Sequence, residues 1–395
     1  MAHAMFDALI VVSILLSIPA ALYSLECFGS SIYIDEPIDK KTGVKSVVLI
    51  PAHNEEAGIV ATLSSLKSQL EEHDRILVIA DNCSDSTAAV ARDAGVDVVE
   101  RSHDSERGKG YALAHGIDQL RDSPPDVVLI VDADCDVSQG SLQQLKSAAI
   151  HYDRPVQGRY LIQSPEGANI STKVSELAVM IRNRARCKGM SAMGIPVPLL
   201  GTGMAFKWAD ITLVPLASGE IVEDMKLGVE LAKAGRGATY LDSAIVTSEF
   251  PSSEEALLTQ RERWEHGHLD ILRRFVLPNV GYALAHFDFR LLFFTLDLAI
   301  PPLTLMLALH LALTFVAFIA ALAFGTVVPF MLFVCGFLSM SAGLVFAWSR
   351  YGKTILPAKE LINILSYVVS KFSIYTRFIT KRQTKWIRTD RDTKK

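Results

Sequence analysis

The sequence has 395 residues, a formal net charge of −4 and a hydrophobic share of 50%, with a mean hydropathy of +0.28. The acidic balance argues against a general nucleic-acid binder, so we expect no nucleic-acid partner. Five scattered cysteines without a CxxC pair argue against a zinc ribbon or a disulfide framework. The positive mean hydropathy is high for a soluble enzyme and indicates segments that enter a membrane.

The first of these segments lies near the N-terminus. Residues 8–25 (ALIVVSILLSIPAALYSL) carry no charge, and their length suits about one bilayer crossing. No Lys or Arg precedes the run, so the positive region of a signal peptide is missing. We therefore predict a retained transmembrane helix within residues 1–28, with a cleaved signal peptide as the alternative.

Strand and helix patterns alternate in the middle of the chain. Short β-rich runs at residues 46–50, 75–80, 97–100 and 127–131 are separated by helical patterns at 57–70, up to 94, and at 110–120. Asn54 is a candidate cap for the first of these helices. The alternation predicts βαβ units and a mostly parallel, Rossmann-like sheet, which places an α/β domain at residues 45–270.

Ligands bind at the carboxyl ends of the strands in such sheets. Here these ends lead into residues 51–56, 81–85 and 132–136, and all three loops carry carboxylates. Three acidic loops on one sheet edge suggest a site for a cation and its polar ligand. RGKG at 107–110 is not a Walker P-loop, and no GxGxxG follows a strand, so P-loop ATP hydrolysis and dinucleotide-dependent hydride transfer are not expected.

The sequence DAD follows the fourth predicted strand. Asp132 and Asp134 should project the same way, whereas Ala133 points into the sheet. Mg²⁺ or Mn²⁺ is commonly held by one or two carboxylates together with substrate phosphates, so these two aspartates are candidate metal ligands. A purely structural loop is the alternative for so short a motif. Asp136 is interpreted as a helix N-cap or loop residue.

A second apolar block and a basic tail complete the chain. Residues 298–349 contain no Asp, Glu, Lys or Arg, which predicts two transmembrane helices with a turn near 325–329. Residues 271–297 and the start of 356–395 mix apolar and basic side chains, as interfacial helices do; ordinary amphipathic helices on the α/β domain are the alternative.

The last fifteen residues carry seven basic and two acidic side chains, so the positive-inside rule places this end, and the domain at 45–270, in the cytoplasm. We expect an integral protein of a bacterial inner membrane, with membrane lipids as partners.

Two further motifs complete an ordered set. IVEDMKLG contains Glu223 and Asp224, and TQRERWEHGH contains Gln260, Arg263 and Trp264 at Q-x-x-R-W spacing. Together with PAHNEE, ADNCSD, RGKG, DAD and GTGMAF, this set resembles the membrane-bound family 2 glycosyltransferases, whose catalytic domain has the GT-A fold. The resemblance covers roughly residues 46–264 and the flanking membrane helices.

The resemblance implies a role for each matching position. The donor side comprises the nucleoside contacts Pro51, Ala52, Glu55 and Asp81, the diphosphate contact Lys109, and the Mg²⁺ or Mn²⁺ ligands Asp132 and Asp134. The acceptor side comprises Gly201, Thr202 and Gly203 beside the acceptor, the general base Asp224 with its neighbour Glu223, and Gln260 and Trp264 at the acceptor end. Arg263 belongs to the donor side, where it contacts the leaving group. Asn82 stands where many relatives carry glycine, which leaves the donor nucleotide less certain.

The residue chemistry supports these roles independently. Sugar transfer with inversion needs a base for the acceptor hydroxyl and a positive group for the departing nucleoside diphosphate. Arg263 suits the diphosphate because a guanidinium binds two oxygens at once. The expected activity is transfer from a UDP-sugar to a lipid-linked or growing polysaccharide acceptor. A processive polysaccharide synthase and a membrane scaffold that only binds a nucleotide-sugar are the alternatives; the small membrane part opposes the first, and the intact motifs oppose the second.

Overall fold

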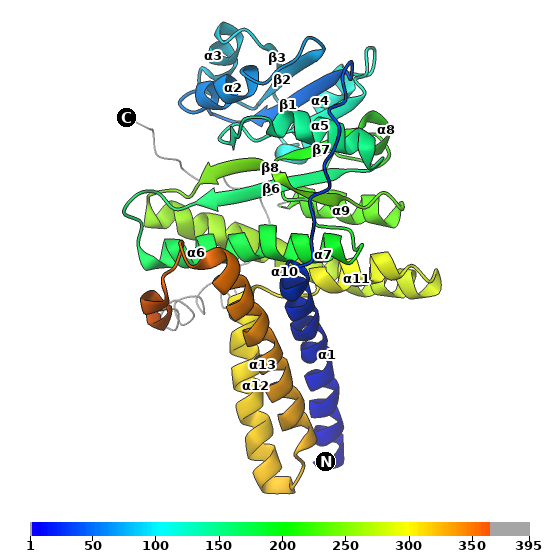
Figure 1. The fold of residues 1–395 in the computed structure, drawn as a ribbon, viewed down its shortest axis with the longest axis vertical. Helices are drawn as coiled ribbons and strands as arrows, with labels where there is room; N and C mark the ends of the chain where they lie inside the picture. The colour runs from blue at the N-terminus through cyan, green and yellow to red at the C-terminus, as the bar shows by residue number, and fades with distance from the viewer. Residues whose placement is uncertain (1, 221, 364–395) are drawn as a thin grey trace. The chain divides into compact units, whose positions relative to one another are not determined.

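A computed structural model describes residues 2–220 and 222–363 of the chain (Figure 1). The described residues fall into two compact units, each of which has its own packing. The sheet unit comprises residues 34–168, 196–220 and 222–267, and the helical unit comprises residues 2–33, 169–195 and 268–363. Helix α10 (Glu254–Ala285) begins in the sheet unit and continues into the helical unit.

The sheet unit is built on one mixed sheet. Within the described residues it has eight strands in the order β3-β2-β1-β4-β7-β6-β8-β5. The strands are β1 (Ser46–Ala52), β2 (Asp74–Asp81), β3 (Asp97–Arg101), β4 (Val127–Ile130), β5 (Asp136–Val137), β6 (Val156–Gln163), β7 (Met204–Lys207) and β8 (Thr239–Glu249). The first four strands pair in parallel, β7 runs antiparallel to both β4 and β6, and β8 is parallel to β6. The predicted α/β class with a mostly parallel sheet is thereby confirmed.

Helices cover both faces of this sheet because the strands are apolar on both sides. They are α2 (Ile59–Lys67), α3 (Thr87–Asp93), α4 (Lys109–Gln119), α5 (Ser141–His151), α8 (Trp208–Ile211) and α9 (Glu223–Lys233). Leucines and isoleucines of α2 and α5 join Val48, Ile50 and Val78 in one buried cluster. Helix α4 packs on the opposite face, where Gly116 lies so close to Leu49 and Ile79 that an added methyl group would be 2.9 Å from Ile79. This two-sided burial accounts for the near-continuous apolar runs of the central strands β1 and β4.

Two local predictions are wrong. Asn54 does not cap α2, whose N-cap is Gly58; instead Asn54 adopts a φ of +57° and its side chain bonds to Ser84 of the neighbouring loop. Asp136 is neither an N-cap nor a turn residue, because it pairs with Thr247 in the short antiparallel contact between β5 and β8. Both residues take part in long-range pairing, which overrides their local preference for caps and turns.

Three helices of the helical unit are long and apolar enough to cross a membrane, as predicted. They are α1 (Ala2–Gly29), α12 (Leu303–Phe324) and α13 (Val328–Ala347), the last of which continues into η2 (Trp348–Gly352). Figure 1 shows the three helices side by side, with α13 packed against both α1 and α12. Helix α12 ends at Gly325 in the left-handed conformation, within the predicted turn.

Shorter helices complete the helical unit. They are α6 (Ile170–Met180), η1 (Ile181–Arg186), α7 (Cys187–Ala192), α11 (Phe289–Leu298) and η3 (Ala358–Asn363). The interfacial helices expected at 271–297 correspond to the end of α10 and to α11. Of the interfacial helix and basic tail expected at 356–395, residues 364–395 lie outside the described part of the chain.

A buried ion triad joins α1 to the shorter helices. Arg186 donates from Nε to Glu26 at 2.6 Å and pairs through Nη2 with Asp297 of α11. The backbones of α1 and α7 also touch, since a methyl group on Gly189 would lie 1.8 Å from the Glu26 carbonyl oxygen. Because buried charges persist only when they are paired, this triad and the close glycine contact fix α1 against its neighbours.

Candidate active site

The sheet topology gathers the predicted donor-side loops at one edge. Strands β2, β1 and β4 are adjacent and parallel, so their carboxyl ends lead to Asp81, to Pro51 and Ala52, and to Asp132 along a single edge. Strand β7 runs antiparallel to β4, with Met204 opposite Ile130, so the loop that precedes β7 reaches the same edge. That loop is Gly201–Gly203, which the sequence placed beside the acceptor.

The DAD loop can hold a hard cation. Ligand atoms of Asp132, Asp134 and Cys135 lie within 4.8 Å of one another, and Ala133 is buried as expected. The two carboxylates are the oxygen ligands that Mg²⁺ and Mn²⁺ prefer. Burial raises the pKa of the Cys135 thiol, and its sulfur lies 3.5 Å from the Thr202 hydroxyl oxygen, so Cys135 stays protonated and is a poor ligand for such an ion. Asp132 and Asp134 therefore fit the metal.

Lys109, the first residue of α4, links three parts of the site. Its ammonium group pairs with Asp132, donates to the Gly201 carbonyl at 2.7 Å, and lies 3.9 Å from Glu223. Burial alone would lower the pKa of Lys109, but the carboxylates of Asp132 and Glu223 outweigh burial and raise it. The ammonium group is therefore charged at neutral pH.

Glu223 and Asp224 open helix α9. The N-cap position is Val222, so neither carboxylate is the N-cap, although acidic side chains in a first turn favour the helix dipole. A methyl group on Gly201 would lie 3.3 Å from Asp224 Oδ2 and 3.4 Å from Lys109 Nζ. Burial and the neighbouring Asp224 raise the pKa of Glu223 to about 7.

These two carboxylates also line a pocket. Its other walls come from α4 and from the segment before α9, among them Gly110, Leu113, Leu216 and Ser218. The pocket therefore lies beside Asp224, the residue expected to act as base, and reaches Gly110, which follows Lys109 in the chain.

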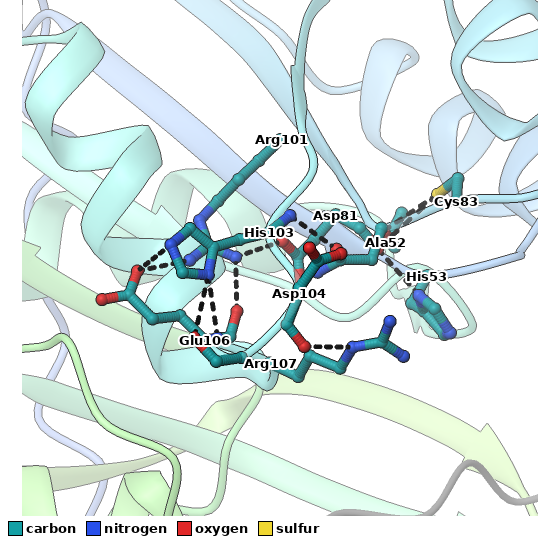
Figure 2. A network of polar contacts seen from close by, with 11 residues as sticks. Ala52, His53, Asp81, Cys83, Arg101, His103, Asp104, Glu106 and Arg107 are labelled. Atoms are coloured by element: carbon teal, nitrogen blue, oxygen red, sulfur yellow. Dashed lines mark hydrogen bonds and ion pairs between the residues drawn. The ribbon is translucent and has the colours of Figure 1, made fainter.

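Asp81 is part of a polar network (Figure 2). Its carboxylate accepts a hydrogen bond from Arg101 at 2.8 Å, and its backbone carbonyl lies 2.7 Å from His53 Nδ1. Arg101 also bonds to the Glu106 side chain at 3.0 Å and to the Glu106 carbonyl at 2.8 Å. Arg101 was not singled out in the sequence, because nothing in the local pattern of β3 marks its pairing with β2.

The remaining predicted residues lie on two elements. Glu55 follows β1, and its backbone N–H donates to the Thr87 hydroxyl at 2.7 Å, which ties the loop to α3. Gln260, Arg263 and Trp264 lie near the start of α10, within the sheet unit, and each is partly buried. Their contacts with a donor or acceptor stay predictions, as do those of Pro51, Ala52 and Glu55.

Comparison with known proteins concerns the family and the fold of the chain. The family model described as "Glycosyltransferase like family 2" matches residues 45–267. The probable glycosyltransferase YdaM of Bacillus subtilis is 25% identical over 300 residues, which cover 70% of each protein. The probable glucomannan 4-beta-mannosyltransferase 10 of Arabidopsis thaliana is 24% identical over 58% of this chain and 44% of its own length.

A solved structure shares the fold. The mannosyltransferase PcManGT from Pyrobaculum calidifontis, solved with GDP-Man and Mn²⁺, superposes with a TM-score of 0.54 at 15% identity, over 95% of this chain and 99% of that one. At this identity the likeness speaks for the fold, whereas the family model covers more than half of the chain. The protein described here therefore belongs to glycosyltransferase family 2.

Proposed function

We propose that this glycosyltransferase transfers a sugar, with inversion, from a UDP-sugar to a lipid-linked or growing polysaccharide acceptor at the cytoplasmic face of a bacterial inner membrane. The observation that carries the proposal is the convergence of Lys109, Asp132 and Asp224 around Gly201 at the carboxyl edge of the sheet. This arrangement would supply a positively charged side chain, a metal-binding carboxylate and a general base within one site.

The proposed division of labour follows from the chemistry of each group. Asp132 and Asp134 would hold a divalent cation, which supplies positive charge to the donor diphosphate. Lys109 would add a fixed positive charge on the same side. Pro51, Ala52, Glu55 and Asp81 would contact the nucleoside.

Asp224 is the proposed general base. It would accept the proton of the acceptor hydroxyl while that oxygen attacks the anomeric carbon and the bond to the nucleoside diphosphate breaks. Glu223 keeps negative charge beside Asp224 once it is ionised, which favours proton transfer. The small residues Gly201 and Gly203 would let the acceptor approach closely, with Gln260, Arg263 and Trp264 at the leaving group and the acceptor end.

The first experiment identifies donor and product. Detergent-solubilised protein is incubated with labelled UDP-glucose, UDP-N-acetylglucosamine or GDP-mannose, with Mn²⁺ or Mg²⁺ and a membrane lipid extract. We expect label from a UDP-sugar in a short lipid-extractable product. Transfer from GDP-mannose alone would overturn the UDP assignment, and transfer from none of them under either metal would overturn the proposal.

The second experiment tests the base. We expect Asp224→Asn to bind UDP and Mn²⁺ as the wild type does, and to lose transfer by about 100-fold or more, as general-base removal does. Preserved turnover in the variant would remove Asp224 from this role.

A second candidate is a processive polysaccharide synthase. The relatives named as glucomannan mannosyltransferases favour it, although the chain spans less than half of their length. Product size separates the two candidates, because label in high-mass polymer would support processive synthesis.

A further inference from the structure

Gln157 is a buried polar side chain to which none of the roles above is assigned. It is the second residue of β6, its side chain is fully buried, and its backbone pairs with Met204, the first residue of β7. A buried side-chain amide carries two donor hydrogens and an acceptor oxygen, and each of them costs free energy if it lacks a partner.

The amide of Gln157 finds its partners on backbone groups. Nε2 donates to the Gly158 carbonyl at 2.9 Å and to the Thr202 carbonyl at 3.0 Å, and Oε1 accepts the N–H of Leu200 at 2.9 Å. Two of these bonds reach the loop that leads into β7. One side chain thus holds this loop at Leu200 and again at Thr202.

The same loop contacts the donor side of the site through its other atoms. The Gly201 carbonyl accepts a hydrogen bond from Lys109 at 2.7 Å, and the Thr202 hydroxyl accepts the backbone N–H of Asp132 at 3.0 Å. Gly201 has a φ of +89°. Because glycine adopts positive and negative φ about equally well, its own preference does not hold this conformation, and neighbouring contacts must do so. Gln157 supplies that support from both sides of Gly201.

We propose that Gln157 is a positioning residue of the glycosyltransferase site. Through the Leu200–Thr202 segment it fixes the Gly201 carbonyl and the Thr202 hydroxyl, and through them the ammonium group of Lys109 and the start of the DAD loop. The role rests on the proposed function of Lys109 and Asp132 in binding the metal and the diphosphate. Gln157 itself acts only through these groups.

The test replaces the amide by an apolar side chain of similar size, Gln157→Met, in the full chain in detergent. The readout is the binding of Mn²⁺ with UDP, measured by calorimetry without sugar transfer. We expect the affinity to fall by about 10- to 100-fold, as it does when outer partners of metal ligands are removed, and the donor KM to rise with it. Gln143→Met in α5 is the matched control; it removes bonds to Lys41 and Ser147 and should bind as the wild type does.

Folded Gln157→Met protein with wild-type affinity for Mn²⁺ and UDP would overturn the positioning role. If that variant does not fold, Gln157→Glu keeps the size of the side chain but replaces the donor Nε2 by an oxygen, and wild-type affinity in it would also overturn the role. Asp134→Asn separates the two proposals: if it binds Mn²⁺ and UDP as the wild type does, the proposed metal site fails. If the Gln157 variants bind Mn²⁺ and UDP as the wild type does and Asp134→Asn does not, the proposed metal site stands and the positioning role of Gln157 fails.

Discussion

The ammonium group of Lys109 is ion-paired with the carboxylate of Asp132, the first carboxylate of the DAD loop. Three aspartates directly after a buried strand would repel one another unless a positive charge lies near them. Lys109 supplies that charge from the first turn of α4, and the third aspartate lies apart in β5. The lysine that stabilises the loop is thus also the group expected to face the diphosphate.

Replacing this lysine tests both tasks at once. In Lys109→Met the carboxylates of Asp132 and Glu223 lose their cation, and the diphosphate loses a charged contact. We expect kcat/KM for the donor to fall by about 100-fold or more, in the range found when one charge-stabilising donor is removed. Lys67→Met, which changes an exposed lysine of α2, should leave donor kinetics unchanged. Equal kinetics in the two variants would contradict the assignment of Lys109.

Metal dependence distinguishes the second and third aspartates of the DADCD sequence. We expect EDTA to abolish transfer and Mn²⁺ or Mg²⁺ to restore it. Asp134→Asn should raise the Mn²⁺ concentration needed for half-maximal activity by about tenfold or more, because one of two proposed carboxylate ligands is lost. Asp136→Asn is the control, since Asp136 is exposed and pairs with β8 through its backbone. If Asp136→Asn has the larger effect, Asp136 and not Asp134 is the metal ligand.

The raised pKa of Glu223 has a consequence for stability. Burial and Asp224 raise this pKa from the ordinary 4.5 to about 7, so between these pH values the folded chain binds more protons than the unfolded chain. The contribution of Glu223 to stability is therefore fully present below pH 4.5 and is lost as pH rises through 7. We expect the wild-type Tm to drop from pH 5 to pH 8 more than that of Glu223→Gln. An identical drop in both proteins would show that Glu223 is not responsible.

The sequence predicted those parts of the fold that local patterns encode. Alternating apolar runs predict strands β1 to β4 and the helices between them. Because these strands are parallel, Asp81 and Asp132 are predicted to lie at the same edge of the sheet. Contacts between distant segments were not predictable in the same way. Arg101 pairs with Asp81 only because β3 lies beside β2, and Gln157 reaches Thr202 only because β6 lies beside β7. Nothing in the identity of either residue signals its partner.

The buried triad in the helical unit is a further long-range contact, and it predicts a large stability effect. Arg186→Met would leave Glu26 and Asp297 buried beside each other without a cation. We expect a loss of about 3–5 kcal/mol in the free energy of unfolding, typical when one member of a buried ion pair is removed. The readout is the thermal midpoint of the detergent-solubilised protein. Arg121→Met, which breaks the exposed pair with Asp118, should leave that midpoint nearly unchanged, and equal midpoints in both variants would argue against the triad.

The pair of Asp81 and Arg101 allows the nucleoside contact to be separated from the structural one. Both side chains are about one-tenth exposed, so Asp81→Asn disturbs Arg101 as well as any bound donor. If Asp81 binds the nucleoside in both enzyme–substrate and transition-state complexes, Asp81→Asn should raise the donor KM by about tenfold and leave kcat unchanged. The same substitution is then made in an Arg101→Met background.

Whether the effects of Asp81→Asn and Arg101→Met on the donor KM are additive decides if Asp81 contacts the nucleoside or only holds Arg101. We expect Asp81→Asn to raise the donor KM by a similar factor whether or not Arg101 is present, because the nucleoside contact persists in both backgrounds. If Asp81→Asn has no further effect once Arg101 is replaced, the carboxylate serves only to hold Arg101 and, through it, the Glu106 loop. In that case the donor nucleoside is bound by other residues of the sheet edge, and Asp81 is not one of its contacts.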